Sequence, residues 1–251
     1  MTLAHDVTGD GTSTLLLLHS GVCDRRMWDG QVKALAAAGH RVVRCDLRGF
    51  GESPVDAAHV HADDIRDLLD HLGIERAALV GSSFGGEVAL EFTVRHPGRT
   101  TALALLCAAA PGHRAGPELR EFFTRENALL EAGDVPAAAD LNATFWLGPD
   151  ATPETHALVR AMQARAFELQ LAAPEEFRAG EVEVTDQDLA AIDVPVLLVT
   201  GGHDVPDFRV IAERLAGLFP DNQWIDLDWA GHLPALERPE ETTGLLLDFL
   251  P

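Results

Sequence analysis

Short, fully apolar runs alternate with segments of helical periodicity from the start of the chain to Ala110. The runs that predict strands are Leu15–Leu18, Val42–Val43, Ala77–Val80 and Leu103–Ala110. Between them, a helix is expected over Met27–Ala38, closed by Gly39. The apolar face of another helix is formed by Ile65, Leu68, Leu69 and Leu72. Strands that are apolar on both faces and separated by helices are typical of a parallel sheet with helices on both sides. Because right-handed crossovers join such strands, we expect their carboxyl ends to meet at one edge of the sheet.

The pattern changes after Pro111. Residues 113–185 contain no strand-like run, and their apolar positions predict helices instead, among them Leu119–Leu130 and Leu158–Leu171. Prolines punctuate these helices at Pro117, Pro136, Pro149, Pro153 and Pro174. We interpret this stretch as a helical insertion.

The strand pattern resumes after the insertion. Val194–Val199 and Trp224–Leu227 predict two more strands, and Pro239 begins a C-terminal helix at a position where a missing N–H costs nothing. The predicted fold class is therefore α/β, with a mostly parallel central sheet flanked by helices. Residues 1–112 and 186–251 form its core domain, and the helical insertion lies between them.

The composition and net charge of the chain argue against some classes of binding partner. The 251-residue chain is 47% hydrophobic and 24% charged, which is usual for a globular protein. Its formal net charge of −21 repels phosphate backbones and anionic lipids, so we expect neither nucleic-acid nor membrane binding. The run Leu15–Leu18 is far shorter than a bilayer span, and Met1–Asp10 lack the basic start and apolar centre of a signal peptide.

The cysteines and histidines predict no metal site. Cys23, Cys45 and Cys107 show no C-x-x-C spacing, and no two histidines form an H-E-x-x-H motif. Three cysteines without such spacing are typical of reduced thiols in the core of a cytoplasmic protein. We therefore expect a cytoplasmic location.

The strongest local signal is the segment Gly81–Gly86, which contains the pattern Gly81-x-Ser83-x-Gly85. It directly follows the predicted strand Ala77–Val80 and directly precedes a helix. A nucleophile at such a sharp strand-to-helix turn needs a strained backbone, and glycines leave room where strand and helix crowd the turn. The helix N-terminus adds unpaired N–H groups and a positive partial charge for a developing oxyanion. A phosphate-binding loop fits less well, because the P-loop lysine and the G-x-G-x-x-G spacing are missing.

A serine hydroxyl needs a histidine as its base and a carboxylate that orients the histidine. His232 follows the last predicted strand, at the same edge of the sheet as Ser83. Asp204 follows the strand Val194–Val199 at that edge. The other loop suited to the carboxylate, residues 107–114, contains no Asp or Glu. The predicted catalytic residues are therefore Ser83, Asp204 and His232.

This arrangement resembles the α/β-hydrolase-fold enzymes. The turn around Ser83, the chain order Ser, Asp, His and the helical insertion all match that family. The resemblance spans nearly the whole chain and is weakest within residues 113–185, where the cap domain of the family varies. It implies the same fold for this chain, with the insertion as its cap.

The resemblance also covers the strand that ends in His19-Ser20-Gly21, although Ser20 stands where the family usually has glycine. It implies an oxyanion hole formed by the backbone N–H groups of Phe84 and Gly21, with Val22 as the second choice for the latter.

A substrate pocket is expected between the sheet edge and the insertion. Core side chains that flank the catalytic positions are Val22, Trp28, Phe84, Val205 and Leu233. Side chains of the insertion that could reach the pocket are Phe122, Phe123, Phe145, Trp146, Leu147 and Met162. This apolar set suggests a substrate with an acyl or ring portion of modest polarity. Arginines that could bind a substrate carboxylate are Arg114, Arg125, Arg160 and Arg165.

The expected function is that of a serine hydrolase of small carboxylic esters or lactones, acting through an acyl-enzyme on Ser83. This chemistry needs no cofactor, and the expected partner is a small-molecule carbonyl substrate. The alternatives that stay open are an enol-lactonase or C–C bond hydrolase of aromatic catabolism, a cofactor-free perhydrolase, and a ligand-binding protein with little turnover. The oligomeric state, including a homodimer, also stays open.

Overall fold

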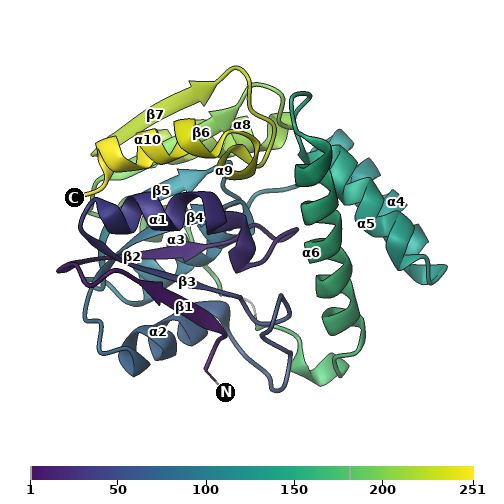
Figure 1. Ribbon diagram of the computed structural model, residues 1–251, viewed down its shortest axis with the longest axis horizontal. Coiled ribbons are helices and arrows are strands. Elements are labelled where there is room, and N and C mark those ends of the chain that lie inside the picture. The colour runs from purple at the N-terminus through teal and green to yellow at the C-terminus, as the bar shows by residue number, and fades with distance from the viewer. Residues whose placement is uncertain (1, 181) are drawn as a thin grey trace.

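A seven-stranded sheet in the order β1-β3-β2-β4-β5-β6-β7 forms the centre of the protein (Figure 1). The computed structural model describes residues 2–180 and 182–251. The strands are β1 (His5–Thr8), β2 (Ser13–Leu18), β3 (His40–Cys45), β4 (Ala77–Ser82), β5 (Thr100–Leu106), β6 (Val196–Gly201) and β7 (Asn222–Leu227). Only the pairing of β1 with β3 is antiparallel, so the predicted α/β class with a mostly parallel sheet is confirmed.

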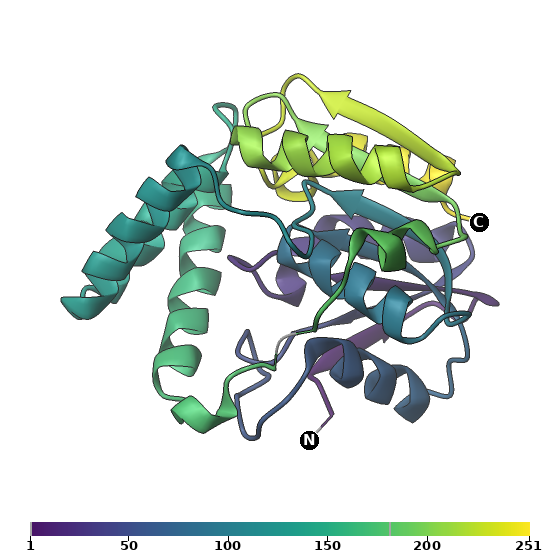
Figure 2. The ribbon, with the colours of Figure 1, turned by 180° about the vertical axis from the view of Figure 1, so that it is seen from behind.

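Helices cover both faces of the sheet. All helices of the described residues, including those of the insertion, are η1 (Arg25–Trp28), α1 (Asp29–Ala37), α2 (His61–His71), α3 (Phe84–Arg95), α4 (Pro117–Glu131), α5 (Val135–Trp146), α6 (Pro153–Leu171), η2 (Glu175–Phe177), α7 (Asp186–Ala190), α8 (Pro206–Leu218), α9 (Pro234–Glu237) and α10 (Pro239–Phe249). Helices α1 and α10 pack together on the face toward the viewer in Figure 1. Helices α2, α3, α7 and α8 form the layer that faces the viewer in Figure 2.

The insertion stands to one side of this sandwich. Helices α4, α5 and α6 lie beside the carboxyl ends of the parallel strands, where the predicted catalytic loops also begin (Figures 1 and 2). No helix among the described residues combines the length and apolar content needed to cross a bilayer.

The centre of the sheet is the core of the protein. The leucines of β2 and every residue of β4 are buried, because these strands are covered on both faces. Cys23, Cys45 and Cys107 are free thiols, and all three are buried. Apolar runs on both faces of a strand therefore identified the central strands correctly.

Three elements differ from the sequence-based expectation. The strand predicted over Leu103–Ala110 ends at Leu106, because Cys107 turns the chain with a φ of 44°. The helix expected over Met27–Ala38 is a 3₁₀ turn followed by α1, which ends at Ala37. Strand β1 was not predicted, because its residues are partly exposed at the sheet edge and do not form an apolar run.

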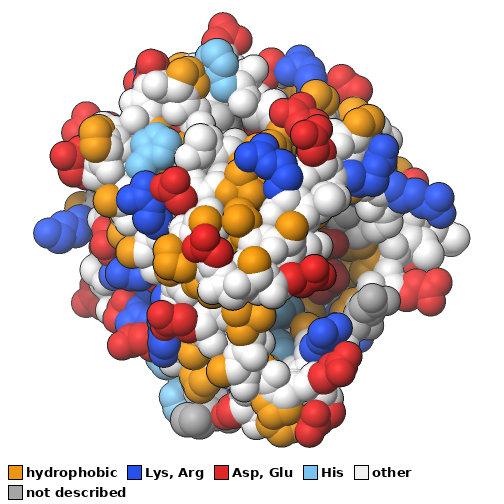
Figure 3. Space-filling view, turned by 90° about the vertical axis from the view of Figure 1, so that its right-hand side faces the viewer, with side chains coloured by type: hydrophobic (Ala, Val, Ile, Leu, Met, Phe, Trp, Pro, Cys, Tyr) orange, Lys and Arg blue, Asp and Glu red, His pale blue; other side chains and the backbone are white. Residues whose placement is uncertain are grey.

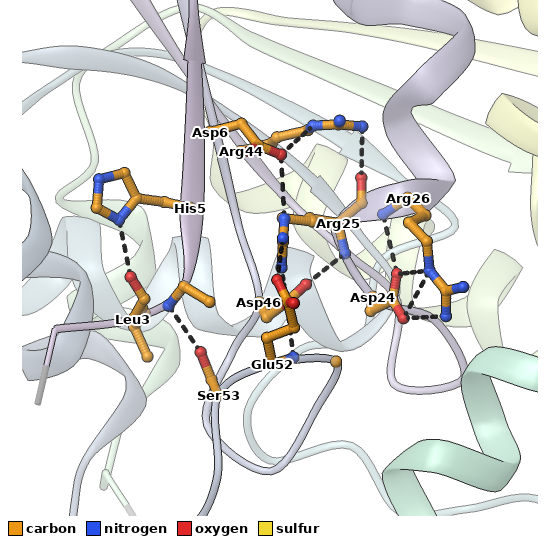
Figure 4. Close-up of polar contacts among 12 residues, drawn as sticks. Leu3, His5, Asp6, Asp24, Arg25, Arg26, Arg44, Asp46, Glu52 and Ser53 are labelled. Atoms are coloured by element: carbon orange, nitrogen blue, oxygen red, sulfur yellow. Dashed lines mark hydrogen bonds and ion pairs between the residues drawn. The ribbon is translucent and has the colours of Figure 1, made fainter.

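A network of ion pairs joins the loop after β2 to the loop after β3 (Figure 4). The fully buried carboxylate of Asp46 pairs with the guanidinium of Arg25, which also binds Asp6 and Glu52. The two oxygens of Asp46 accept hydrogen bonds from the backbone N–H groups of Arg25 and Glu52, each at 2.8 Å. Because one carboxylate holds both loops, the loop that contains Gly21 has a fixed position relative to the sheet.

His19 provides a second link between these loops. Its Nε2 accepts a hydrogen bond from the backbone N–H of Leu47 at 2.9 Å, so its Nδ1–H donates to the carbonyl of Ser20 at 2.8 Å. The side chain has no exposed surface. Burial lowers the pKa of His19, since the charged imidazolium would lose its hydration there.

This burial predicts an acid-labile fold. Unfolding returns the pKa of His19 to about 6.5, so below that pH the unfolded chain binds a proton that the folded chain resists. The stability that His19 contributes is complete above that pH and is lost as the pH falls. We expect His19→Gln to reduce the slope of unfolding free energy against pH, between pH 5 and 6.5, by up to about 1.4 kcal/mol per unit.

Urea unfolding monitored by tryptophan fluorescence at several pH values measures this slope. His203→Gln, which replaces an exposed histidine, serves as the control and should retain the wild-type slope. A slope that is identical in wild type and His19→Gln would contradict the assignment.

Candidate active site

Ser83 occupies the turn between β4 and α3, with φ 50° and ψ −116°. Non-glycine residues rarely adopt a positive φ, and holding one there costs about 1–3 kcal/mol. Backbone hydrogen bonds fix the turn: the N–H of Ser83 donates to the carbonyl of Leu106 at 3.0 Å, and its carbonyl accepts from the N–H of Ala109 at 3.0 Å. Strand β5 and the loop after it therefore hold Ser83 in its strained conformation.

Two glycines of the turn have no room for a side chain. A Cβ at Gly81 would lie 2.5 Å from the carbonyl oxygen of Gly85, and a Cβ at Gly85 would lie 2.4 Å from the carbonyl oxygen of Leu18. Both neighbours are backbone atoms, which cannot move aside as a flexible side chain can. The crowding of strand and helix that the glycine spacing predicted is therefore present.

Asp204 and His232 form a buried hydrogen-bonded pair. The Nδ1 of His232 lies 2.8 Å from Oδ2 of Asp204, and the two side chains are 2% and 4% exposed. The other carboxylate oxygen, Oδ1, accepts from the N–H of Val205 at 2.7 Å. Because the carboxylate engages Nδ1, Nε2 is the ring nitrogen of His232 that remains for a second hydrogen-bond partner.

Two aromatic rings enclose the imidazole. The ring centroid of Phe208 lies 4.1 Å from that of His232, and the centroid of Trp146 lies 4.4 Å from it. The backbone N–H of His232 also donates to the carbonyl of Trp146 at 2.9 Å. Since Trp146 ends α5 and Phe208 belongs to α8, the imidazole is positioned from both the insertion and the core.

Glu237 holds the loop on both sides of His232. Its Oε2 accepts from the N–H of Gly231 at 2.8 Å, and its Oε1 accepts from the N–H of Leu233 at 3.1 Å. Burial raises the pKa of Glu237, while these N–H donors and the nearby His232 lower it and so oppose the effect of burial. Glu237 is therefore a positioning residue that acts through the backbone of the histidine loop.

Ser83 and His232 line the same cavity, which has a volume of about 430 Å³. Gly21 and Phe84 line it as well, and a Cβ on Gly21 would lie only 3.4 Å from the Cβ of Phe84. The two residues proposed for the oxyanion hole are therefore neighbours beside the serine. Asp204 lies behind the imidazole.

The predicted substrate-binding residues divide into two groups. Those that line the cavity are Val22, Phe84, Phe122, Phe123 and Trp146. Those that do not line it are Trp28, Phe145, Leu147, Met162, Val205 and Leu233. Trp28, Met162 and Leu233 are fully buried in the hydrophobic core, and Phe145 stacks on Phe122 with centroids 4.2 Å apart.

Several lining residues were not identified from the sequence. The apolar ones include Phe50, Leu119, Phe167, Phe208 and Ile211. The polar ones include Glu87, His113, Glu126, Asn142, Gln163 and Gln170. Phe208 could have been found from its position in the first turn of the helix that follows Asp204. The polar residues of α4, α5 and α6 carry no signal that separates the cavity face from the solvent face.

Among residues 2–180 and 182–251, two groups of at least three side chains bring metal-ligating atoms within 4.8 Å of one another. One consists of Cys107, Asp204 and His232, in which the carboxylate and imidazole already bind each other. The other consists of His59, His61 and Asp64. Both oxygens of Asp64 accept hydrogen bonds from the guanidinium of Arg48, at 2.8 and 3.0 Å, so this carboxylate already neutralises a cation.

Comparison with known proteins identifies the family of this chain. Residues 13–239 match the model of a family described by the alpha/beta hydrolase fold. A putative carbamate hydrolase, RutD of Variovorax paradoxus, is 31% identical over 260 residues, which covers all of this chain and 96% of that protein. The carboxylesterase YbfK of Bacillus subtilis is 28% identical and covers 94% of this chain and 80% of its own length.

A solved structure shows the same architecture. The enol-lactonase from Burkholderia xenovorans LB400 superposes with a TM-score of 0.80 and 25% identity, covering 99% of this chain and 96% of that one. The match extends over both the sheet and the inserted helices.

The two hydrogen bonds that Glu237 accepts lead to a testable prediction. In Glu237→Gln, an amide NH₂ replaces one acceptor and faces a backbone N–H of the histidine loop. We expect kcat for an ester substrate to fall by about 10- to 100-fold while KM stays nearly unchanged, because small misplacements of a base lower the rate of the chemical step.

Steady-state kinetics with p-nitrophenyl butyrate measures both constants. Glu240→Gln, an exposed substitution in the first turn of α10, is the matched control and should behave as wild type. A rise in KM at constant kcat would show that Glu237 acts on binding rather than on the base.

Proposed function

Because the chain belongs to the alpha/beta hydrolase fold family, we propose that it cleaves small carboxylic esters or lactones through an acyl-enzyme on Ser83. The protein is a hydrolase, and its relatives include a carboxylesterase and an enol-lactonase. The observation that carries the proposal is the bond between Asp204 and His232, which leaves the second ring nitrogen to the cavity that Ser83 lines.

In the first half of the proposed reaction, the Oγ of Ser83 attacks the substrate carbonyl carbon, and its proton passes to Nε2 of His232. The carbonyl oxygen becomes an oxyanion, which the N–H groups of Gly21 and Phe84 stabilise, each worth roughly 3–4 kcal/mol. When the intermediate collapses, the bond to the leaving alcohol breaks. His232 returns the proton to that oxygen, and the acyl group stays on Ser83.

In the second half, a water molecule gives a proton to His232 and attacks the acyl carbon. The new intermediate breaks the bond to Ser83, which regains its proton from His232, and the carboxylic acid leaves. Asp204 keeps the imidazole in one tautomer and stabilises its charged form throughout. With a lactone, the leaving alcohol stays attached to the acyl group, so a single hydroxy acid is released.

The proposal extends to the organisation of the chain. Residues 113–185 act as a cap over the site, and residues 1–112 together with 186–251 act as the core. The substrate is a small-molecule carbonyl compound. The cytoplasmic location expected from the cysteines stays a prediction.

The triad assignment is tested with p-nitrophenyl acetate and butyrate. We expect Ser83→Ala and His232→Ala to lower kcat/KM by at least about 10³-fold, because each removes a group that acts in the chemical step. A fluorophosphonate probe should label wild type at one site per chain and should not label Ser83→Ala.

Ser82→Ala is the matched control, since Ser82 is buried next to Ser83 and its Oγ has no hydrogen-bond partner. This variant should be labelled and should keep its turnover. Undiminished turnover in Ser83→Ala or His232→Ala would refute the mechanism.

A further inference from the structure

The lining of the cavity beside Ser83 is acidic. Two carboxylates, Glu87 and Glu126, belong to its lining, and no lysine or arginine is among the described residues that line it. The four arginines considered from the sequence are absent from this lining, and two of them have partners elsewhere: Arg160 binds Asp140, and Arg165 binds Glu168. The two histidines of this lining are already bound to carboxylates, His113 to Asp207 and His232 to Asp204. The described part of the cavity therefore offers acceptors for a substrate and no lysine or arginine for a substrate carboxylate.

Glu126 has a fixed orientation. Its Oε1 accepts from Nδ2 of Asn142 at 2.5 Å, and Asn142 is 1% exposed. The same Nδ2 donates to the carbonyl of Ala138 at 2.9 Å, and Oδ1 accepts from the indole N–H of Trp146 at 3.0 Å. Because Trp146 also packs on His232, this chain of bonds ties the carboxylate to the catalytic histidine and leaves its Oε2 for a ligand.

A second acceptor lines the same cavity. Gln163 of α6 is only 4% exposed, and its Oε1 has no hydrogen-bond donor. A buried amide oxygen without a donor is unfavourable, and a ligand N–H or O–H is the kind of group that would complete it.

Glu126 also stands where a long substrate would pass. It lines a second cavity, of about 650 Å³, that shares several residues with the first, among them Gly21, Phe84 and Glu126. Two arginines also line the second cavity, and both are paired with carboxylates: Arg48 with Asp56 and Asp64, and Arg178 with Glu175. Figure 3 looks onto this side of the molecule, where the surface is hollowed and acidic, histidine and hydrophobic side chains lie in the hollow. A substrate that extends from Ser83 under the inserted helices therefore meets the carboxylate of Glu126.

We propose that the substrate portion under α4 and α6 is uncharged or cationic and carries an N–H or O–H donor that Glu126 binds, whereas esters with a carboxylate there are rejected. This inference rests on the proposed function and names the substrate class of that site. Its physical basis is the repulsion between like charges in a partly desolvated cavity, where water screens them poorly. Charge-assisted hydrogen bonds from a donor to a carboxylate act in the opposite direction.

Two matched series of esters test the proposal. One contains methyl hexanoates with hydrogen, hydroxyl, ammonium or carboxylate at carbon six, and the other contains hexyl acetates with the same groups at carbon six. In at least one series, wild type should hydrolyse the hydroxyl and ammonium esters with kcat/KM at least tenfold above the carboxylate ester. Equal kcat/KM values across both series, or a preference for the carboxylate, would overturn the proposal.

Glu126→Gln removes the charge and keeps an oxygen that can accept from Asn142. In this variant we expect the preference for ammonium over carboxylate to fall about tenfold, with an unchanged melting temperature. Glu121→Gln, an exposed residue of the same helix, is the control and should keep the wild-type preference. A preference that is equal in wild type and Glu126→Gln would assign the selectivity to another group and overturn the role of Glu126.

The fluorophosphonate probe separates failure of this inference from failure of the proposed function. If no ester in either series is hydrolysed and Ser83 is not labelled, the proposed function itself is wrong. If the esters are hydrolysed without regard to charge, the serine mechanism stands and only the substrate class is wrong.

Discussion

The close approach of β4 and α3 is the constraint on which the candidate site depends. Because the backbones of Gly81 and Gly85 lie against neighbouring carbonyl groups, the chain can pass from strand to helix only through a sharp turn. Ser83 occupies that turn with a positive φ, and hydrogen bonds from β5 and the loop after it hold it there. The backbone strain is therefore located at Ser83, at the edge of the sheet, and the hydrogen bonds to the neighbouring strand maintain it.

The histidine loop depends on contacts from outside the sheet. The rings of Trp146 and Phe208 enclose the imidazole of His232, and Glu237 binds the backbone on both sides of it. The inserted helices thus do more than cover the cavity, since the last residue of α5 contacts the imidazole directly. The same helix carries Asn142, which orients Glu126, so α5 contacts both the imidazole of His232 and one carboxylate of the cavity lining.

Sequence patterns were informative wherever local chemistry dictates structure. Apolar runs identified the central strands because both of their faces are buried, and the spacing Gly81-x-Ser83-x-Gly85 identified the turn because few residues tolerate that backbone. The edge strand β1 gave no such pattern, since partial exposure permits polar residues. The end of β5 at Leu106 also escaped prediction, because apolar residues continue past the point where Cys107 turns the chain.

The cavity lining was harder to predict for a physical reason. An aromatic residue in an inserted helix can pack against neighbouring helices or into a pocket: Phe145 stacks on Phe122, whereas Phe123 lines the cavity. Glu237 binds backbone N–H groups only six and four residues before it, but such bonds from a side chain to the backbone leave no periodic signal in the sequence. The sequence therefore predicts well which strands form the sheet and where the turn at Ser83 lies, and it predicts poorly which side chains line the cavity.

The most direct test of the central claim is a crystal structure of the protein after reaction with a fluorophosphonate. The account predicts a covalent bond from phosphorus to Oγ of Ser83, with the phosphoryl oxygen within hydrogen-bond distance of the N–H groups of Gly21 and Phe84. It also predicts that Nε2 of His232 lies beside the bonded oxygen. An adduct on another residue, or a phosphoryl oxygen that points away from both N–H groups, would contradict it.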